Sequence, residues 1–194
     1  KRLALYGTGR TGIIPDEICR MTSLQELSLG KNDLKGPIPS CLGDLKQLRF
    51  LAAHTNGLTG SIPPELCKCT DLVALEFGKN TLDGKLPSCL GKLTKLDYLS
   101  LGDNTISGDF PQELAALTNM KILLCDGNML TGDPTSVLTS WPDLDRVYAD
   151  NNNFTGVIDD KFLVNSTLLR WLDLSHNNLT TADGLPGHLL KLSS

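Results

Sequence analysis

The chain has 194 residues, of which 21% are charged, and a formal net charge of −4 at pH 7. It has no excess of lysine and arginine, which nucleic-acid binding requires, so we expect no nucleic-acid partner. No apolar run approaches the roughly 18 residues of a membrane-spanning helix, so we predict no membrane span within this chain.

One motif repeats from one end of the chain to the other. Residues 24–39 read LQELSLGKNDLKGPIP, which follows the pattern LxxLxLxxNxLxGxIP. An incomplete first copy covers residues 3–15. A fixed period in the twenties is typical of a solenoid with one coil per repeat. The opening residue recurs every 24 residues, and after 25 at the last step: Leu24, Leu48, Leu72, Leu96, Met120, Leu144 and Leu169.

Each repeat is expected to begin with a short strand. The LxL part of the motif, Leu27 and Leu29 in the second copy, has the two-residue alternation of a half-buried strand. A strand this short is stable only when it pairs with its copies, so we predict one long parallel sheet with strands about 4.8 Å apart. The chain must then return to the next strand, and we expect helical segments on that outer path.

Three further columns of the repeat are expected to be structural. A stack of buried asparagine amides can donate and accept hydrogen bonds, and so satisfy loop backbone groups. A glycine marks a sharp bend where a side chain would obstruct, and a proline starts the helical segment. The asparagines are Asn32, Asn56, Asn80, Asn104, Asn128, Asn152 and Asn177; the glycines are Gly12, Gly36, Gly60, Gly84, Gly108, Gly132 and Gly156; the prolines are Pro15, Pro39, Pro63, Pro87 and Pro111.

With these letters the chain resembles the plant-type leucine-rich repeat family, whose mark is the LxGxIP extension after the asparagine. Receptor-kinase ectodomains and polygalacturonase inhibitors carry this type. The resemblance implies a single α/β solenoid domain over residues 1–194, a superhelix of about eight turns of 24 residues. The parallel sheet would form the concave face, short helical or 3-10 segments the convex face, and the LxGxIP segments a second, shorter sheet. The incomplete first turn and the missing caps indicate a fragment or a processed product, and residues 180–194 are expected to form an irregular C-terminal end that covers the open edge.

Four of the six cysteines form two pairs with one spacing. Cys19 and Cys41 are 22 residues apart, and so are Cys67 and Cys89. Each pair flanks the same buried column in successive turns, so its members should face each other at about 7 Å between Cα atoms. We predict two disulfides; the alternatives are four separate thiols or, less favoured for want of ligand spacing, a metal site. The remaining cysteines occupy apolar columns and are expected to be buried thiols: Cys69 and Cys125.

Two features indicate the secretory pathway. The predicted disulfides need an oxidising compartment. Three Asn-x-Ser/Thr triplets, at Asn153, Asn165 and Asn178, are candidate glycosylation sites, and Asn165 in the divergent outer segment is the strongest of them. We therefore expect an extracellular or cell-surface protein.

No catalytic or cofactor-binding constellation is present. His54, His176 and His188 lie in different turns and have no serine or cysteine partner at a meaningful spacing. There is neither a glycine-rich nucleotide loop nor a zinc-ligand spacing. We therefore predict a protein that is not an enzyme and that holds no cofactor or metal.

The variable residues between the motif leucines are the candidate functional residues, because they project from the solvent side of the sheet. Large apolar groups gather there beside aspartates, with one arginine as the cationic exception, and such neighbours on a concave surface are typical of a contact site. A protein or peptide with a basic, partly apolar surface would fit; a solvated face and a calcium site are the alternatives. The predicted ligand-binding residues are Phe50, Tyr98, Ile122, Leu124, Asp126, Arg146, Tyr148, Asp150, Trp171 and Asp173.

We therefore predict a non-catalytic module that recognises a protein or peptide on its concave face. The alternative from another class is a structural or assembly subunit of a cell-surface or larger complex. Adsorption to glycan or ice is less favoured, because it needs a regular row of identical residues. The threonine column is interrupted by charges: Thr11, Lys35, Thr59, Asp83, Ser107, Thr131, Thr155 and Thr180.

Overall fold

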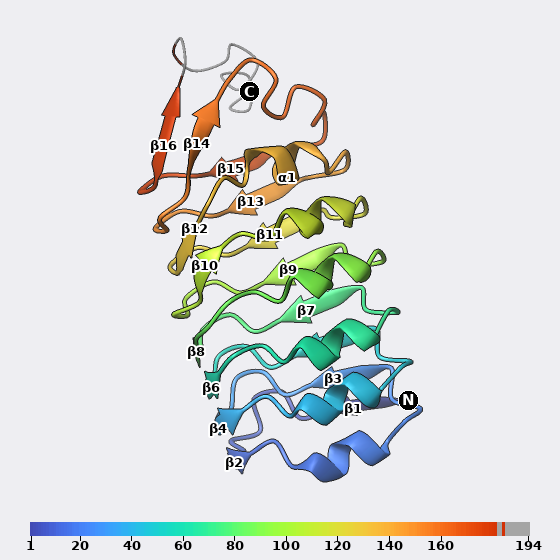
Figure 1. The fold of residues 1–194 in the computed structure, drawn as a ribbon. Helices are drawn as coiled ribbons and strands as arrows, with labels where there is room; N and C mark the ends of the chain where they lie inside the picture. The colour runs from blue at the N-terminus through green and yellow to red at the C-terminus, as the bar shows by residue number, and fades with distance from the viewer. Residues whose placement is uncertain (182–183, 185–194) are drawn as a thin grey trace.

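The computed structural model describes residues 1–181 and residue 184, and these form a stack of similar coils (Figure 1). Each coil contributes one three-residue strand to an eight-stranded parallel sheet, the main sheet, in which every strand pairs with that of the next coil. The register follows the repeat, since Leu27 lies opposite Leu3 on one side and Leu51 on the other. The strands are β1 (Arg2–Ala4), β3 (Glu26–Ser28), β5 (Phe50–Ala52), β7 (Ala74–Glu76), β9 (Tyr98–Ser100), β11 (Ile122–Leu124), β13 (Arg146–Tyr148) and β15 (Trp171–Asp173).

A second set of short parallel strands follows the asparagine of each repeat. These strands form three separate sheets, of four, two and two strands. A single bridge between Lys85 and Ser107 spans the first gap. The second sheet is thus confirmed, but in three pieces. Its strands are β2 (Thr11–Ile13), β4 (Asp33–Pro37), β6 (Gly57–Gly60), β8 (Thr81–Leu82), β10 (Ser107–Asp109), β12 (Met129–Thr131), β14 (Thr155–Ile158) and β16 (Asn178–Thr181).

Short helices lie on the return paths of the coils, opposite the main sheet (Figure 1), which confirms the predicted helical side. The repeated proline precedes each 3-10 helix instead of starting it, because its backbone is extended, with φ −61° and ψ 126° at Pro39. Among residues 1–181 and 184, no helix is long and apolar enough to cross a membrane. The helices are η1 (Asp16–Arg20), η2 (Ser40–Asp44), η3 (Pro64–Lys68), η4 (Ser88–Lys92) and η5 (Gln112–Ala116), all 3-10, and the α-helix α1 (Thr135–Thr139).

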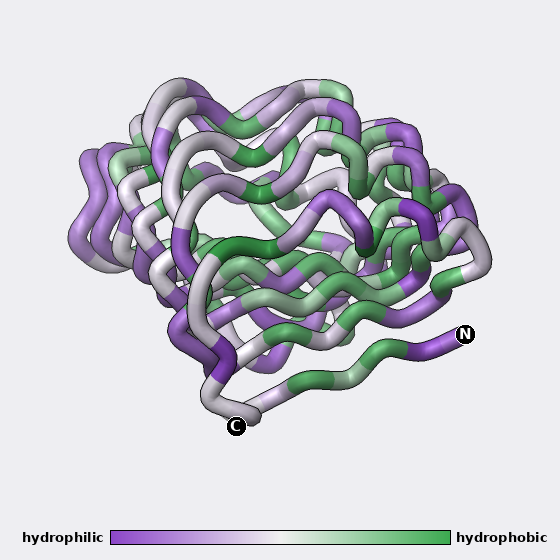
Figure 2. The backbone as a smooth tube through the Cα atoms, turned by 90° about the horizontal axis from the view of Figure 1, so that it is seen from below, coloured by the Kyte–Doolittle hydropathy of each residue, from purple (hydrophilic) through white to green (hydrophobic). Residues whose placement is uncertain are grey.

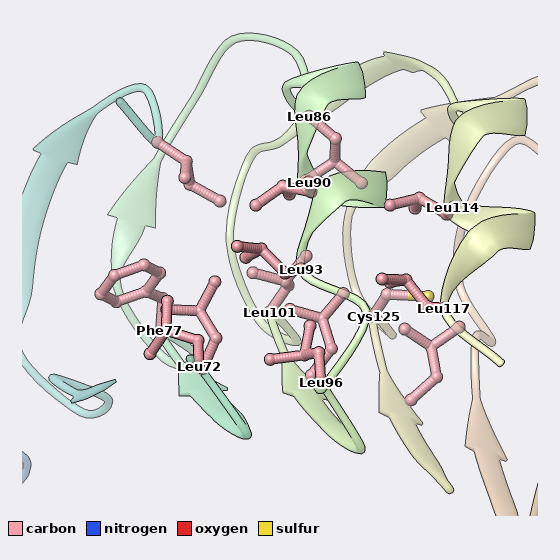
Figure 3. Packing of buried hydrophobic residues seen from close by; sticks show 14 of the residues in the cluster. Leu72, Phe77, Leu86, Leu90, Leu93, Leu96, Leu101, Leu114, Leu117 and Cys125 are labelled. Atoms are coloured by element: carbon pink, nitrogen blue, oxygen red, sulfur yellow. The ribbon is translucent and has the colours of Figure 1, made fainter. Parts of the chain in front are cut away.

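The hydrophobic core runs through the whole stack between the main sheet and the helices. Seen along the stack, hydrophobic stretches recur at the same places of successive coils (Figure 2). Figure 3 shows the packing at close range: Leu96 and Leu101 of one coil lie between Leu72 of the coil before and Cys125 of the coil after. All four side chains are fully buried. Burial of one leucine stabilises the fold by about 1.5–3 kcal/mol, and here neighbouring coils provide that burial for each other.

The asparagine column makes the hydrogen bonds that were predicted for it. The side-chain nitrogen of Asn80 donates to the carbonyl of Ala53 in the preceding coil at 3.1 Å and to that of Phe77 at 2.8 Å. Its side-chain oxygen accepts the backbone N–H of Leu58 at 3.0 Å. The equivalent asparagines repeat this pattern, so each one joins two coils where the strands have ended.

The glycine column has a different cause from the one predicted. At Gly60 φ is +72°, a conformation that L side chains rarely adopt, yet an added Cβ would meet no atom within 4 Å. Backbone conformation therefore requires glycine there, and the predicted obstruction is wrong at this position. At Gly156 both reasons apply, because a Cβ would also lie 2.4 Å from the carboxylate of Asp133.

Both predicted disulfides are present. Cys19 is bonded to Cys41 and Cys67 to Cys89, each with 5.8 Å between the Cα atoms. This is shorter than the expected 7 Å, because helical segments rise less per residue than strands. The remaining two thiols are buried, as predicted: Cys69 and Cys125.

The predicted irregular end over residues 180–194 is wrong at its beginning, since Thr180 and Thr181 belong to β16. Except for Gly184, the rest of that segment, including His188, lies outside the described residues.

Candidate ligand-binding face

The candidate site lies on the solvent-exposed face of the main sheet, on the side away from the helices. We call it the sheet face. In each strand the middle residue points into the core, and its two neighbours point away from it. In β9, for example, Leu99 is fully buried, whereas Tyr98 and Ser100 are partly exposed. The strand pairing therefore sets these outward residues side by side in columns across the stack.

A pocket of about 550 Å³ lies on the sheet face, which we call the central pocket. It runs from the carboxyl end of β5 to β13. Six of the ten predicted ligand-binding residues line it: Tyr98, Ile122, Leu124, Asp126, Arg146 and Tyr148. The apolar groups and the opposite charges that the sequence placed in neighbouring columns thus share one pocket.

The other four predicted residues do not line the central pocket. Phe50 lines a smaller pocket of about 250 Å³ nearer the amino-terminal coils. Trp171 is half exposed and stacks on the ring of Tyr148. The carboxylate of Asp173 accepts the backbone N–H and the hydroxyl of Ser175, and that of Asp150 accepts a hydrogen bond from Asn151.

Four charged or titratable residues of the central pocket are not among the ten predicted ligand-binding residues: His54, Glu76, Lys79 and Asp103. His54 and Glu76 occupy the same outward columns as the predicted residues, so column position was the available signal. Lys79 comes from the turn after β7, where φ is +58°. The predicted set included residues just beyond the strands, such as Asp126, but not the next turn position, which Lys79 occupies.

The charges within the pocket differ in how they are paired. The imidazole of His54 lies 3.9 Å from the carboxylate of Glu76, and the ammonium of Lys79 lies 4.0 Å from that of Asp103. Asp126 has no ion pair within the part of the chain that the structure describes. Burial, with the nearby carboxylates of Asp103 and Asp150, raises the pKa of Asp126 above its usual value.

Arg146 is held only weakly by its neighbours. Its Nε lies 3.5 Å from the carboxylate of Asp145. That carboxylate already accepts two hydrogen bonds from the guanidinium of Arg170, which lower the pKa of Asp145. The guanidinium of Arg146 is therefore available at the edge of the central pocket.

The pocket is suited to non-covalent binding. Aromatic and aliphatic side chains form its middle, and charges of both signs surround them. The ring Nδ1 of His54 lies 3.1 Å from the hydroxyl of Thr55, and its Nε2 lies 3.9 Å from the carboxylate of Glu76, which is beyond hydrogen-bond distance. In residues 1–181 and 184 no three His, Cys, Asp or Glu side chains gather as metal ligands would.

Comparison with known proteins decides the family. Residues 23–45 and 168–192 match the family model described as Leucine Rich Repeat. In the crystal structure of the BIR3–SERK2 complex from Arabidopsis thaliana, one chain is 39% identical over 66% of this chain and 68% of its own length, with a TM-score of 0.59. This chain belongs to the plant-type leucine-rich repeat family.

Other leucine-rich repeat structures are similar over more of the chain. The plant peptide hormone receptor RGFR1, solved in complex with RGF2, is 33% identical over 87% of this chain, with a TM-score of 0.83. This chain spans 27% of that receptor. A plant ice-binding protein is 25% identical over 92% of this chain and 64% of its own, with a TM-score of 0.68. No curated protein sequence matches the chain.

The family and the two disulfides also indicate the cellular location of this leucine-rich repeat chain. Disulfides persist in oxidising compartments, and the receptor relatives are ectodomains. The chain is therefore extracellular or at the cell surface, as the sequence predicted.

Proposed function

We propose that this leucine-rich repeat chain is a non-catalytic recognition module that binds a peptide, or an extended segment of a protein, in the central pocket. One observation carries the proposal: Tyr98, Ile122, Leu124 and Tyr148 form a continuous apolar area in a pocket of about 550 Å³. Apolar groups gathered in a pocket and surrounded by polar side chains are typical of binding sites.

The relatives support the same proposal. RGFR1 is a plant peptide hormone receptor in complex with RGF2, and PEPR1 is solved with AtPEP1. RGFR1 thus combines a similar structure with the role of a peptide hormone receptor. For the present chain, the pocket itself provides the residues that would make such contacts.

The experiment is a selection from a phage-displayed library of random peptides on the immobilised, oxidised chain. The selected peptides are then measured against a variant with Tyr98→Ala and Tyr148→Ala. Loss of these two rings should weaken binding by about tenfold or more, because aromatic groups dominate such contacts. The matched control is Val157→Ala, an exposed apolar residue on β14, which should leave binding unchanged.

A selection that yields no binding peptide, or peptides that bind the double variant as well as the wild type, would contradict the proposal. Binding that is lost on changing exposed apolar residues away from the sheet face would instead favour the assembly-subunit alternative. The controls for that outcome are Leu168→Ala and Val164→Ala.

The second set of strands, which carries the threonine column, gives less support to adsorption to ice or glycan. Lys35 and Asp83 interrupt the threonine column, and the hydroxyl of Thr131 donates to the carboxylate of Asp109 at 2.6 Å. The column therefore does not present a uniform row of free hydroxyl groups. An ice-recrystallisation assay checks this directly, and we expect no activity.

A further inference from the structure

Two opposite charges face each other across the apolar middle of the central pocket. Asp126 follows β11 at the carboxyl ends of the strands, and Arg146 opens β13 at their amino ends. Leu124 and Tyr148 lie at the register position between them, and Ile122 lies beside Arg146. The pocket therefore has an acidic side, an apolar middle and a basic side.

These two charges differ from the others in the pocket because neither has an ion-pair partner of its own among the described residues. His54 is beside Glu76 and Lys79 is beside Asp103. Asp126, by contrast, has no cationic partner among the described residues, and Arg146 shares its only carboxylate with Arg170. A half-buried charge without an ion pair, as at Asp126, is costly, and an incoming cation would remove that cost; the exposed guanidinium of Arg146 can pair with an incoming anion.

The carboxylate of Asp126, on the acidic side, lies close to the neighbouring coil. A Cβ added at Gly102 would lie 2.5 Å from Oδ1 of Asp126, so the carboxylate leans over the glycine of the neighbouring coil. Carboxylates of Asp103 and Asp150 lie nearby and raise the pKa of Asp126 together with its burial. The negative potential is thus concentrated at one side of the pocket.

The distance across the pocket defines a matching ligand. Asp126 is four residues beyond Ile122, the partner of Arg146 in the sheet register, and four extended residues span about 13 Å. In an extended peptide, residues i, i+2 and i+4 point to one side over the same length. Three side chains of a short extended peptide can therefore reach the two charges and the apolar middle together.

We infer that the ligand segment is an extended peptide with an acidic residue, an apolar residue and a basic residue at alternate positions, i, i+2 and i+4. Its carboxylate pairs with Arg146, its apolar side chain lies on Ile122, Leu124 and Tyr148, and its cation pairs with Asp126. This inference rests on the proposed function and specifies the chemistry of the partner.

The test uses the peptides selected from the same random library. They should be enriched in the acidic–x–apolar–x–basic pattern, in either chain direction. Asp126→Asn should weaken their binding by about tenfold, and so should Arg146→Gln, because each change removes one charge-assisted contact. The matched controls are Asp83→Asn and Arg20→Gln, exposed charges away from the sheet face, which should have no effect.

A charge reversal makes the test specific. With Asp126→Lys and Arg146→Glu together, selection should return peptides in which each charge has the opposite sign, and circular dichroism would verify that this variant is folded. Peptides that depend on Tyr98 and Tyr148 but show no charge pattern would overturn this inference and leave the proposed function standing. A selection without any pocket-dependent peptide would overturn both.

Discussion

The indole ring of Trp171 stacks on the phenol ring of Tyr148, with 5.6 Å between the ring centroids and 17° between the ring planes. The two residues are not partners in the sheet register, because Trp171 lies opposite Arg146 and Tyr148 opposite Asp173. The stack therefore runs diagonally from β13 to β15 and extends the apolar middle of the central pocket toward the last described coil.

This stack should contribute to stability as a coupled pair. A double-mutant cycle with Trp171→Ala and Tyr148→Ala should give a coupling energy of about 0.5–1.5 kcal/mol, the range for aromatic pairs. Urea unfolding followed by circular dichroism measures it. A coupling energy near zero would show that the rings do not interact in solution.

The asparagine column should be the most sensitive polar feature of the fold. Asn80→Ala leaves the N–H of Leu58 without its partner and removes one of the two asparagine donors to each of the carbonyls of Ala53 and Phe77, so we expect a loss of about 1–3 kcal/mol in the free energy of unfolding. Asn119→Ala is the control, because its one bond, to the carbonyl of Thr94, is exposed. Equal effects of the two changes in urea unfolding would contradict the structural role of the column.

The disulfides should stabilise the amino-terminal coils. Each closes a loop of 22 residues, and the chain-entropy model then assigns about 3 kcal/mol to each bond. Cys19→Ser with Cys41→Ser should lower the free energy of unfolding by about that amount, and a reductant should further destabilise this variant through the second bond.

The two free thiols, Cys69 and Cys125, allow an independent check of the disulfide pairing. Burial raises the pKa of both Cys69 and Cys125, so they should not react with a thiol reagent in the native chain. Rapid labelling of the native, oxidised chain would show that its core is open or that its cysteines are paired differently.

Two aspartates should affect stability in opposite directions. The folded-state pKa of Asp126 is raised, mainly by burial, so the folded chain loses stability as pH rises from the ordinary value of 3.8 through the raised one. Asp126→Asn should therefore raise Tm near neutral pH. The pKa of Asp145 is lowered by Arg170, so its contribution is present above the ordinary value and is lost as pH falls through the lowered one. Asp145→Asn should lower Tm, and thermal unfolding of both variants checks the two signs.

The sequons should be usable without blocking the central pocket. Asn153, Asn165 and Asn178 are exposed, and none lines that pocket. Asn178 lies opposite Thr155 in β14, and that threonine completes the triplet of Asn153, so these two sites are close together. Mass spectrometry of the chain secreted from plant cells should find glycan most fully at Asn165. Enzymatic removal of the glycans should leave the binding of selected peptides unchanged.

The repeat pattern alone determined the solenoid, the main sheet, the helical side, the asparagine column and both disulfides. The physical reason is that each of these features depends on contacts between equivalent positions of neighbouring coils, such as Leu27 with Leu51 or Cys19 with Cys41. In a one-dimensional stack, sequence spacing translates directly into spatial neighbourhood.

Only the tertiary structure decided the extent of the pocket and the pairing of its charges. It brought His54, Glu76 and Lys79 into the pocket and left Phe50 outside it. It also showed that Asp145 is occupied by Arg170, which leaves Arg146 available. These features depend on side-chain rotamers, turn residues and the relative placement of several coils. They vary from coil to coil, so the repeat period carries no information about them.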